Sequence, residues 1–204
     1  ARRIKAEFPE VLVGGPVLCW PPAYGSDWHT WPLWVETFVN KAGPSIDFFD
    51  FHTYDVPEAR LRSEIETIWG YLRQTLGRPV PLVISESNYG LNFSVEDYDN
   101  LHRHWAARTL PYARLLLTLL EMPDKVTGNQ THDLSARRFR LAWNQDEQPP
   151  MYWLLWCLAG FSGERLLTSG SSPSVRTLAA HSPGRIDVVV FNDSTERQHV
   201  RLEL

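Results

Sequence analysis

One carboxylate stands where a buried strand gives way to polar residues. Glu86 follows the apolar residues 81–85, and a carboxylate that is nearly buried loses its hydration unless it is hydrogen-bonded or used in chemistry. His52 and Tyr54 follow a second apolar run, residues 46–51, and both can hydrogen-bond a carboxylate and hold it ionised. These residue types predict a nucleophile or general base with two supporting neighbours. The alternative is structural, with Glu86 paired to an arginine at the rim of a sheet.

Tryptophan is abundant, with 9 among 204 residues, and four of them lie within residues 20–34. Indole rings can stack on the apolar faces of sugars while nearby polar groups bind the hydroxyls. The sequence therefore predicts a carbohydrate-binding cleft. The candidate substrate-binding residues are Trp20, Trp28, Trp31, Asn88 and Tyr89. Trp34 and Trp69 lie instead on apolar helical faces and are expected in the core.

Several other kinds of chemistry lack their minimal motifs. His102 and His104 are two residues apart on a predicted helix and point in different directions, and no Cys-x-x-Cys pair, phosphate-binding glycine loop or Gly-x-Ser-x-Gly motif occurs. The net charge is -4, and the sequence shows no cluster of basic residues that would bind nucleic acid. The longest apolar run, residues 115–120, is far shorter than a membrane-spanning helix. We expect no metal, no cofactor, no nucleic-acid partner and no membrane span. Cys19 and Cys157, each in an apolar setting beside a tryptophan, are expected as buried free thiols.

Alternating strands and helices position these residues. The predicted strands are residues 11–13, 46–51 and 81–85, and the predicted helices are residues 28–40, 57–76 and 95–120, the last kinked or restarted at Pro111. A fourth strand comes from residues 125–130 or 139–143, and a fourth helix from residues 150–160. Continuously apolar strands between helices predict an α/β fold with a parallel sheet, whose functional side chains gather at the carboxyl ends of the strands.

The pattern changes near residue 164. Residues 175–180, 186–191 and 199–204 alternate or run apolar between Ser-Pro-Gly and Asn-Asp-Ser turns, which predicts antiparallel strands. We therefore expect the chain to divide into residues 1–163 and a separate small domain over residues 164–204.

The strand-end motifs resemble those of clan A glycoside hydrolases. They are Val-Gly-Gly-Pro from residue 13, Ile-Asp-Phe-Phe-Asp-Phe-His-Thr-Tyr-Asp from residue 46, and Leu-Val-Ile-Ser-Glu-Ser-Asn-Tyr-Gly from residue 82. Their order matches the fifth to seventh strands of those barrels. Met-Pro-Asp-Lys-Val from residue 122, Tyr-Trp-Leu-Leu-Trp from residue 152 and Gly-Glu-Arg-Leu from residue 163 are most similar to the β-agarase and β-porphyranase family, with the β-xylosidase and iduronidase family next.

This resemblance implies a fold and an activity. Residues 1–163 would form about strands five to eight of a (β/α)8 TIM barrel, and residues 164–204 part of an accessory β-sandwich. Glu86 would be the nucleophile of a retaining glycosidase, with Tyr54 and His52 beside it, acting on a β-linked polysaccharide such as an agarose- or porphyran-type galactan. The resemblance also implies a carbohydrate partner and a secreted or periplasmic location.

The sequence departs from the family in one respect. The acid/base Glu of this clan follows an Asn at the end of the fourth strand, and no Asn-Glu pair occurs here. We expect strands one to four and the acid/base residue upstream of Ala1, so that the chain as given is an inactive half barrel with exposed sheet edges. In a complete chain Asp50, Asp55 or Glu121 would have to serve instead, but four strand-helix units cannot close an eight-stranded barrel.

Three further alternatives stay open. The chain could be a non-catalytic carbohydrate-binding remnant of a barrel, a β-xylosidase-like exo-glycosidase, or an open doubly wound domain with unrelated small-molecule chemistry. The strand order distinguishes the last of these from a barrel.

Overall fold

The computed structural model describes residues 1–18, 31–89, 101–132, 150–169, 172 and 174–203. A four-stranded parallel sheet forms its centre, with the strands side by side in chain order, β1-β2-β3-β4. The strands are β1 (Gly14–Leu18), β2 (Phe48–Tyr54), β3 (Leu82–Asn88) and β4 (Val126–Thr131). An open doubly wound sheet reverses its strand order at a switch point, whereas a barrel keeps chain order. The partial-barrel prediction is therefore confirmed, and the doubly wound alternative is wrong.

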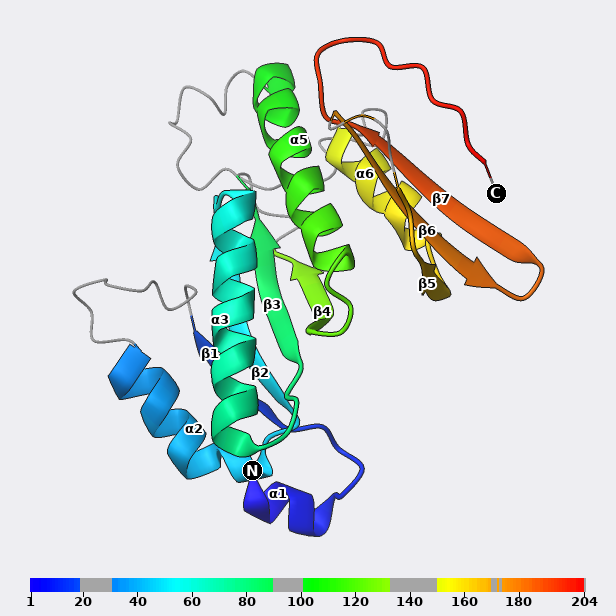
Figure 1. The fold of residues 1–204 in the computed structure, drawn as a ribbon. Helices are drawn as coiled ribbons and strands as arrows, with labels where there is room; N and C mark the ends of the chain where they lie inside the picture. The colour runs from blue at the N-terminus through cyan, green and yellow to red at the C-terminus, as the bar shows by residue number, and fades with distance from the viewer. Residues whose placement is uncertain (19–30, 90–100, 133–149, 170–171, 173, 204) are drawn as a thin grey trace.

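Helices α2 (Thr37–Ala42), α3 (Glu58–Leu76) and α5 (Leu101–Leu120) cover one face of this sheet (Figure 1). The described helical segments also include α1 (Arg2–Glu7), a π-helical segment η1 (Trp31–Glu36), a 3-10 turn η2 (Gly43–Ser45) and α6 (Pro150–Ala159), which packs on α5. The predicted helix over residues 57–76 is confirmed to within one residue. It ends because Gly77 adopts a left-handed φ of 66° and donates its N–H to the Arg73 carbonyl. No helix in the described part of the chain is long and apolar enough to cross a membrane.

The hydrophobic core lies between the sheet and α3. Alternate residues of β2 and β3 face the helices and are fully buried, and so is one stripe of α3 at spacings of three and four. These residues are Phe49, Phe51, Leu82, Ile84, Leu61, Ile65, Ile68 and Leu72. The residues that alternate with these on β2 and β3 point to the other face of the sheet.

A second, antiparallel sheet lies beside α5 together with α6 (Figure 1). It consists of β5 (Glu164–Leu166), β6 (Val175–Ser182) and β7 (Arg185–Asn192), in that order. Two of the three predicted strands are confirmed. Residues 199–203 form no strand, because they have no paired neighbour and are exposed. The division of the chain at residue 164 stays a prediction.

The strands of the parallel sheet differ from the predicted ones at their ends. The first strand includes none of the predicted residues 11–13 and runs instead from Gly14 to Leu18, inside the segment predicted as a loop, because Gly14 and Gly15 pair with Phe48 and Phe49 of β2. Residue 14 must be glycine, because a Cβ there would lie 2.2 Å from the ring of Phe48. Strands β2 and β3 run on through Tyr54 and Asn88, since polar residues continue the ladder between neighbouring strands. Polar composition therefore did not mark the end of either strand. The fourth strand is the first of its two candidates; residues 139–143 lie outside the described residues.

Two residues predicted to be buried are exposed. Trp34 is 56% exposed, because residues 31–36 form a π-helical segment, and its wider turn shifts the side-chain positions away from those of an α-helix. Cys157 is an exposed free thiol on α6. Cys19 lies outside the described residues. Trp69 packs against the core as expected.

Candidate active site

A carboxylate with three polar neighbours lies at the carboxyl ends of β2, β3 and β4. Glu86 Oε2 accepts a hydrogen bond from Tyr54 Oη at 2.6 Å and lies 3.2 Å from His52 Nδ1. His132, which directly follows β4, places its Nδ1 3.6 Å from the same oxygen. The structure therefore brings together the three residues that the sequence proposed as catalytic and places beside them a fourth polar side chain, His132, that the sequence did not single out.

Glu86 reaches this cluster through a β-bulge in β3. Asp50 pairs with Val83 and His52 with Glu86, so between these pairs one residue of β2 lies opposite two of β3. On the other side Ile84 pairs with Asn129 and Ser87 with Thr131, again with one residue too many in β3. The extra residue reverses the alternation of side chains after Ile84.

Without that extra residue, Glu86 would point the other way. Ile84 belongs to the helix-facing core, and strict alternation would send Glu86 to the same face. Instead Ser87 takes the helix-facing position, where its hydroxyl lies 2.9 Å from the Tyr112 hydroxyl of α5. Glu86 is turned to the opposite face, beside His52 and Tyr54, where its side chain is 32% exposed. The bulge thus makes the carboxylate accessible.

The hydroxyl of Tyr112 anchors the helix-facing side of this region. It lies 2.7 Å from Thr131 Oγ1 as well as close to Ser87, so it joins the ends of β3 and β4. Burial raises the pKa of Tyr112 above its usual value, and the hydrogen bonds from its neighbours oppose that rise only in part. The phenol therefore stays protonated and serves as a structural link.

His132 is held in place by its backbone. Its N–H donates to the Ser87 carbonyl at 2.9 Å, and its carbonyl accepts from Asn88 Nδ2 at 2.9 Å. Its ring lies edge-on to Tyr54, with centroids 6.1 Å apart. The sequence held a signal for His132, because this residue follows the polar residues at the end of the fourth strand. It was missed because residues 125–130 and 139–143 were both candidates for that strand.

Asn88 corrects one prediction. It was expected to bind substrate, but it is 1% exposed and has no surface to offer a sugar. Its Oδ1 accepts hydrogen bonds from the Tyr89 N–H at 2.8 Å and from Arg108 Nη2 at 3.0 Å, while its Nδ2 holds His132. Arg108, itself buried, also donates to the Tyr89 carbonyl at 2.7 Å. Asn88 thus fixes the residues that follow β3 and β4.

The aromatic candidates fall in different places. Trp20 and Trp28 lie outside the described residues. Trp31 packs edge-on against Tyr71 of α3, with ring centroids 5.1 Å apart, in the helical layer. Tyr89 is half-buried directly after β3. Their roles as walls of a sugar subsite stay predictions.

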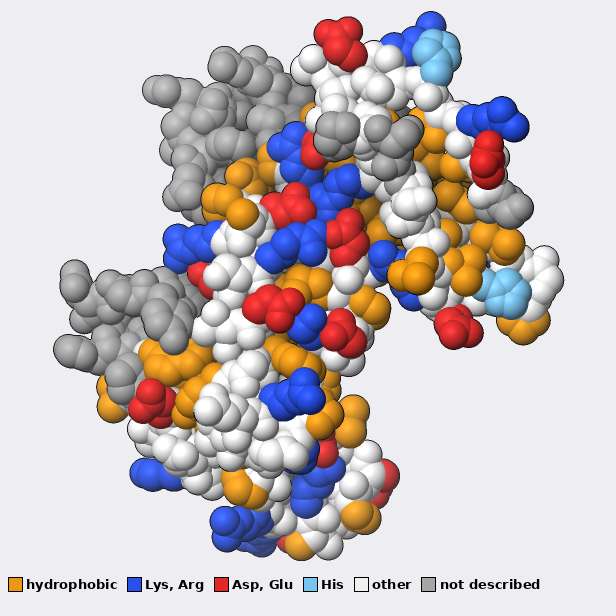
Figure 2. All heavy atoms as spheres, in the orientation of Figure 1, with side chains coloured by type: hydrophobic (Ala, Val, Ile, Leu, Met, Phe, Trp, Pro, Cys, Tyr) orange, Lys and Arg blue, Asp and Glu red, His pale blue; other side chains and the backbone are white. Residues whose placement is uncertain are grey.

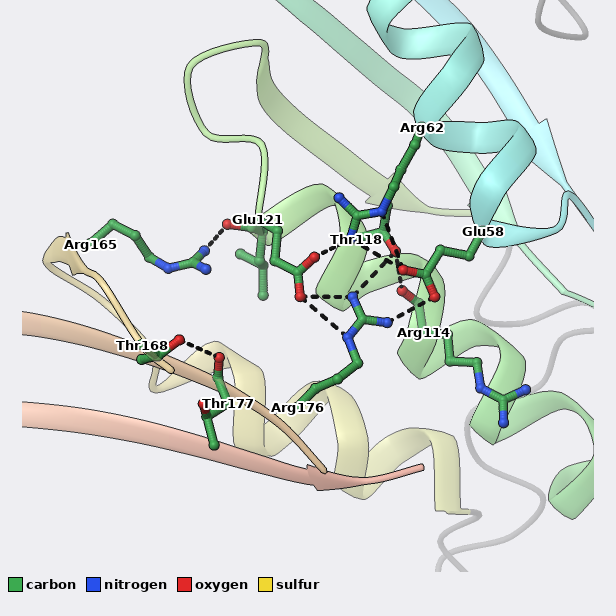
Figure 3. A network of polar contacts seen from close by, with 10 residues as sticks. Glu58, Arg62, Arg114, Thr118, Glu121, Arg165, Thr168, Arg176 and Thr177 are labelled. Carbon is green, nitrogen blue, oxygen red and sulfur yellow. Dashed lines mark hydrogen bonds and ion pairs between the residues drawn. The ribbon is translucent and has the colours of Figure 1, made fainter. Parts of the chain in front are cut away.

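The other candidate acids are distributed as follows. Glu121, at the end of α5, is bound by Arg62 of α3 and Arg176 of β6 (Figure 3), so it does not face Glu86. The buried Asp50 accepts the Ser85 N–H at 3.1 Å. Asp55 directly follows Tyr54 and remains a candidate. Among the described residues, no group of three His, Cys, Asp or Glu side chains could hold a metal ion.

Comparison with known proteins places this geometry in context. No family profile matches the chain. The funoran endo-β-hydrolase of Wenyingzhuangia aestuarii is 25% identical over 141 residues, which cover 62% of this chain and 18% of that protein. The chain therefore spans less than a fifth of that curated relative.

Solved structures of glycoside hydrolases share the fold. A family 86 enzyme variant in complex with neoagarooctaose superimposes with a TM-score of 0.73 and 20% identity, over 94% of this chain and 34% of that one. A family 86 β-porphyranase from the human gut bacterium Bacteroides plebeius has a TM-score of 0.64 and 18% identity, and the match covers 89% of this chain and 36% of that one. A family 39 β-xylosidase from Caulobacter crescentus has a TM-score of 0.57 and 21% identity, and the match covers 92% of this chain and 40% of that one. These are the two families that the strand-end motifs resemble, so that resemblance is confirmed.

Proposed function

We propose that this chain is the nucleophile-bearing half of a retaining glycoside hydrolase that cleaves a β-linked galactan. Glu86 is the nucleophile, Tyr54 and His52 hold it, and His132 is a third neighbour. Enzymes of agarose- and porphyran-type galactans are among the proteins that share its fold, and the relative from Wenyingzhuangia aestuarii carries the name of a funoran hydrolase. Secretion to meet such a polysaccharide is part of the proposal.

The observation that carries the proposal is how the carboxylate of Glu86 is held. Its Oε2 accepts a hydrogen bond from Tyr54 and faces the Nδ1 atoms of His52 and His132, whereas its Oε1 has no hydrogen-bond partner among the described residues. A carboxylate bound through one oxygen keeps its orientation while the other oxygen is open to attack an anomeric carbon. A purely structural Glu at a sheet rim would instead be paired with an arginine, and its neighbours here are a tyrosine and two histidines.

The chemistry needs a second carboxyl group. In a retaining glycosidase the acid protonates the leaving oxygen as the glycosidic bond breaks, and the nucleophile forms an ester bond to the anomeric carbon. Water, deprotonated by the same acid/base residue, then breaks that ester and restores the carboxylate. The two carboxyl groups lie about 5 to 5.5 Å apart. The four strands of the described parallel sheet cannot close a barrel, and the family 86 structure with neoagarooctaose is about three times as long, so we propose that the remaining strands and the acid/base residue belong to chain outside these residues.

Hydrolysis by the full-length protein that contains this chain tests the proposal. We expect reducing sugar from at least one of agarose, porphyran or funoran, and loss of that activity by about 10³-fold or more in Glu86→Gln. Azide added to Glu86→Ala should restore turnover and yield a glycosyl azide of inverted configuration, because the small anion replaces the missing carboxylate. Glu66→Gln is the matched control, since Glu66 pairs with Lys125 on the surface of α3. Near-full activity in Glu86→Gln would refute the nucleophile assignment.

Two alternatives predict other outcomes. The likeness to family 39 enzymes favours an exo-acting β-xylosidase, which would release xylose from short xylo-oligosaccharides and leave galactans intact. A binding remnant would retain an oligosaccharide without cleaving it, and Glu86→Gln would leave its affinity almost unchanged.

A further inference from the structure

The bulge in β3 has a specific partner on the neighbouring strand. Asp50 lies on β2, two residues before His52 and four before Tyr54, and its side chain is on the same face as theirs. Its Oδ1 accepts the backbone N–H of Ser85, the residue directly before Glu86, at 3.1 Å. Asp50 is only 5% exposed, so this hydrogen bond lies inside the protein.

A bulge interrupts the hydrogen-bond ladder between strands at its extra residue. A buried backbone amide that is left unpaired there lowers the stability of the fold. The register shows the insertion between Ile84 and Ser87, the segment that contains Ser85. The Asp50 carboxylate provides an acceptor at this position without belonging to the backbone ladder. It therefore stabilises the bulged path of β3 over a regular one.

We propose that Asp50 is a positioning residue for Glu86: by accepting the Ser85 N–H it fixes the bulge that turns the Glu86 carboxylate toward Tyr54 and His52. The proposal rests on Glu86 being the nucleophile. Asp50 acts through the backbone and does not itself touch substrate. In a β3 strand of regular register, Glu86 would face the helix layer that Ile84 occupies, and its Oε2 would lose the hydrogen bond from Tyr54 and its contacts with His52 and His132.

The test compares two substitutions in the full-length protein. Asp50→Ala removes the acceptor, so we expect kcat to fall about 10- to 100-fold while KM changes by less than about threefold, as for a misplaced catalytic group. Asp50→Asn keeps an oxygen of the same shape at the same place and should stay within about fivefold of wild type. Asp47→Asn is the matched control, because Asp47 also accepts a backbone N–H from the neighbouring chain segment, that of Val13 at 2.7 Å, but before the start of β2. Its kcat should be unchanged.

Amide hydrogen exchange measures the bulge itself. Exchange at Ser85 should be at least about tenfold faster in Asp50→Ala than in wild type or Asp50→Asn, whereas Val83 should not change. This readout does not depend on activity, so it separates failure of this inference from failure of the proposed function. The inference is overturned if a folded Asp50→Ala keeps kcat within about twofold, or if Ser85 exchange is unchanged. If Asp50→Ala does not fold, a fall in kcat of more than about fivefold in Asp50→Asn also overturns the inference.

Discussion

Arg176 of β6 joins the antiparallel sheet to the helices of the barrel half, and its removal should cost stability in a measurable way. Its Nε and Nη2 donate to Glu121 Oε1 at 3.2 and 2.8 Å, and its Nη1 donates to Glu58 Oε2 at 2.9 Å (Figure 3). Arg62 of α3 binds the same two carboxylates from the other side. Acidic and basic side chains gather over this part of the surface, where α3 and α5 meet the second sheet (Figure 2).

The expected magnitude follows from how these groups are solvated. A hydrogen bond to a charged group contributes about 1.5–3 kcal/mol when it is buried, and an exposed ion pair less than about 1 kcal/mol. The Arg176 side chain is only 15% exposed, but both carboxylates keep some solvent and both retain Arg62 after Arg176 is lost. We therefore expect Arg176→Met to lower the free energy of unfolding by about 2 kcal/mol, which is about 4–8 °C in Tm for a chain of this size.

Urea unfolding and a double-mutant cycle check this value. In the cycle, Arg176→Met combined with Glu121→Gln should show a coupling of about 1 kcal/mol, because two N–H groups of Arg176 donate to one oxygen of Glu121. Arg185→Met is the control, since Arg185 pairs with Asp187 on the exposed surface of β7, and it should change stability by less than about 0.5 kcal/mol. If Arg176→Met is as mild as Arg185→Met, the network does not hold the two sheets together and the reasoning is wrong.

Three further predictions concern single positions. Tyr54→Phe removes the 2.6 Å hydrogen bond to Glu86 and should lower kcat of the full-length protein about 10- to 100-fold with little change in the melting temperature; an unchanged kcat would exclude Tyr54 from the site. Burial acts to raise the pKa of Glu121, but the hydrogen bonds from its two arginines outweigh it and hold that pKa below its usual value. Its contribution to stability is therefore complete above its ordinary unfolded pKa and is lost as pH falls through the lower folded pKa, so Glu121→Gln should flatten the acid side of the stability curve in urea titrations at different pH. Gly163 has a φ of 117°, and a Cβ there would lie 2.3 Å from the His181 carbonyl oxygen, so Gly163→Ala should lower the melting temperature by more than about 4 °C in a thermal scan.

Much of the fold could be predicted because local patterns agree with one another. The apolar stripe of α3 and its glycine stop specify that helix in any context, and continuously apolar strands between helices specify a parallel sheet. The site was found by the same logic, since the carboxyl ends of such strands meet at one edge. Errors appeared where packing overrode local preference. Gly14 and Gly15 read as a loop, yet they lie in β1 because they pair with Phe48 and Phe49 of β2.

Sequence alone determined which residues to propose for the chemistry: a Glu, a His and a Tyr at the ends of neighbouring strands of the parallel sheet. It could not determine which way Glu86 points. A one-residue insertion in β3 reverses the side-chain alternation, and that insertion is visible only in the pairing with β2 and β4. The tertiary structure also brought His132 to the cluster and buried Asn88, because both depend on how far the polar ends of β3 and β4 remain paired. The physical reason is that the type of each residue is given by the sequence at that position. The face of the sheet to which its side chain points depends instead on how its strand pairs with the neighbouring strands.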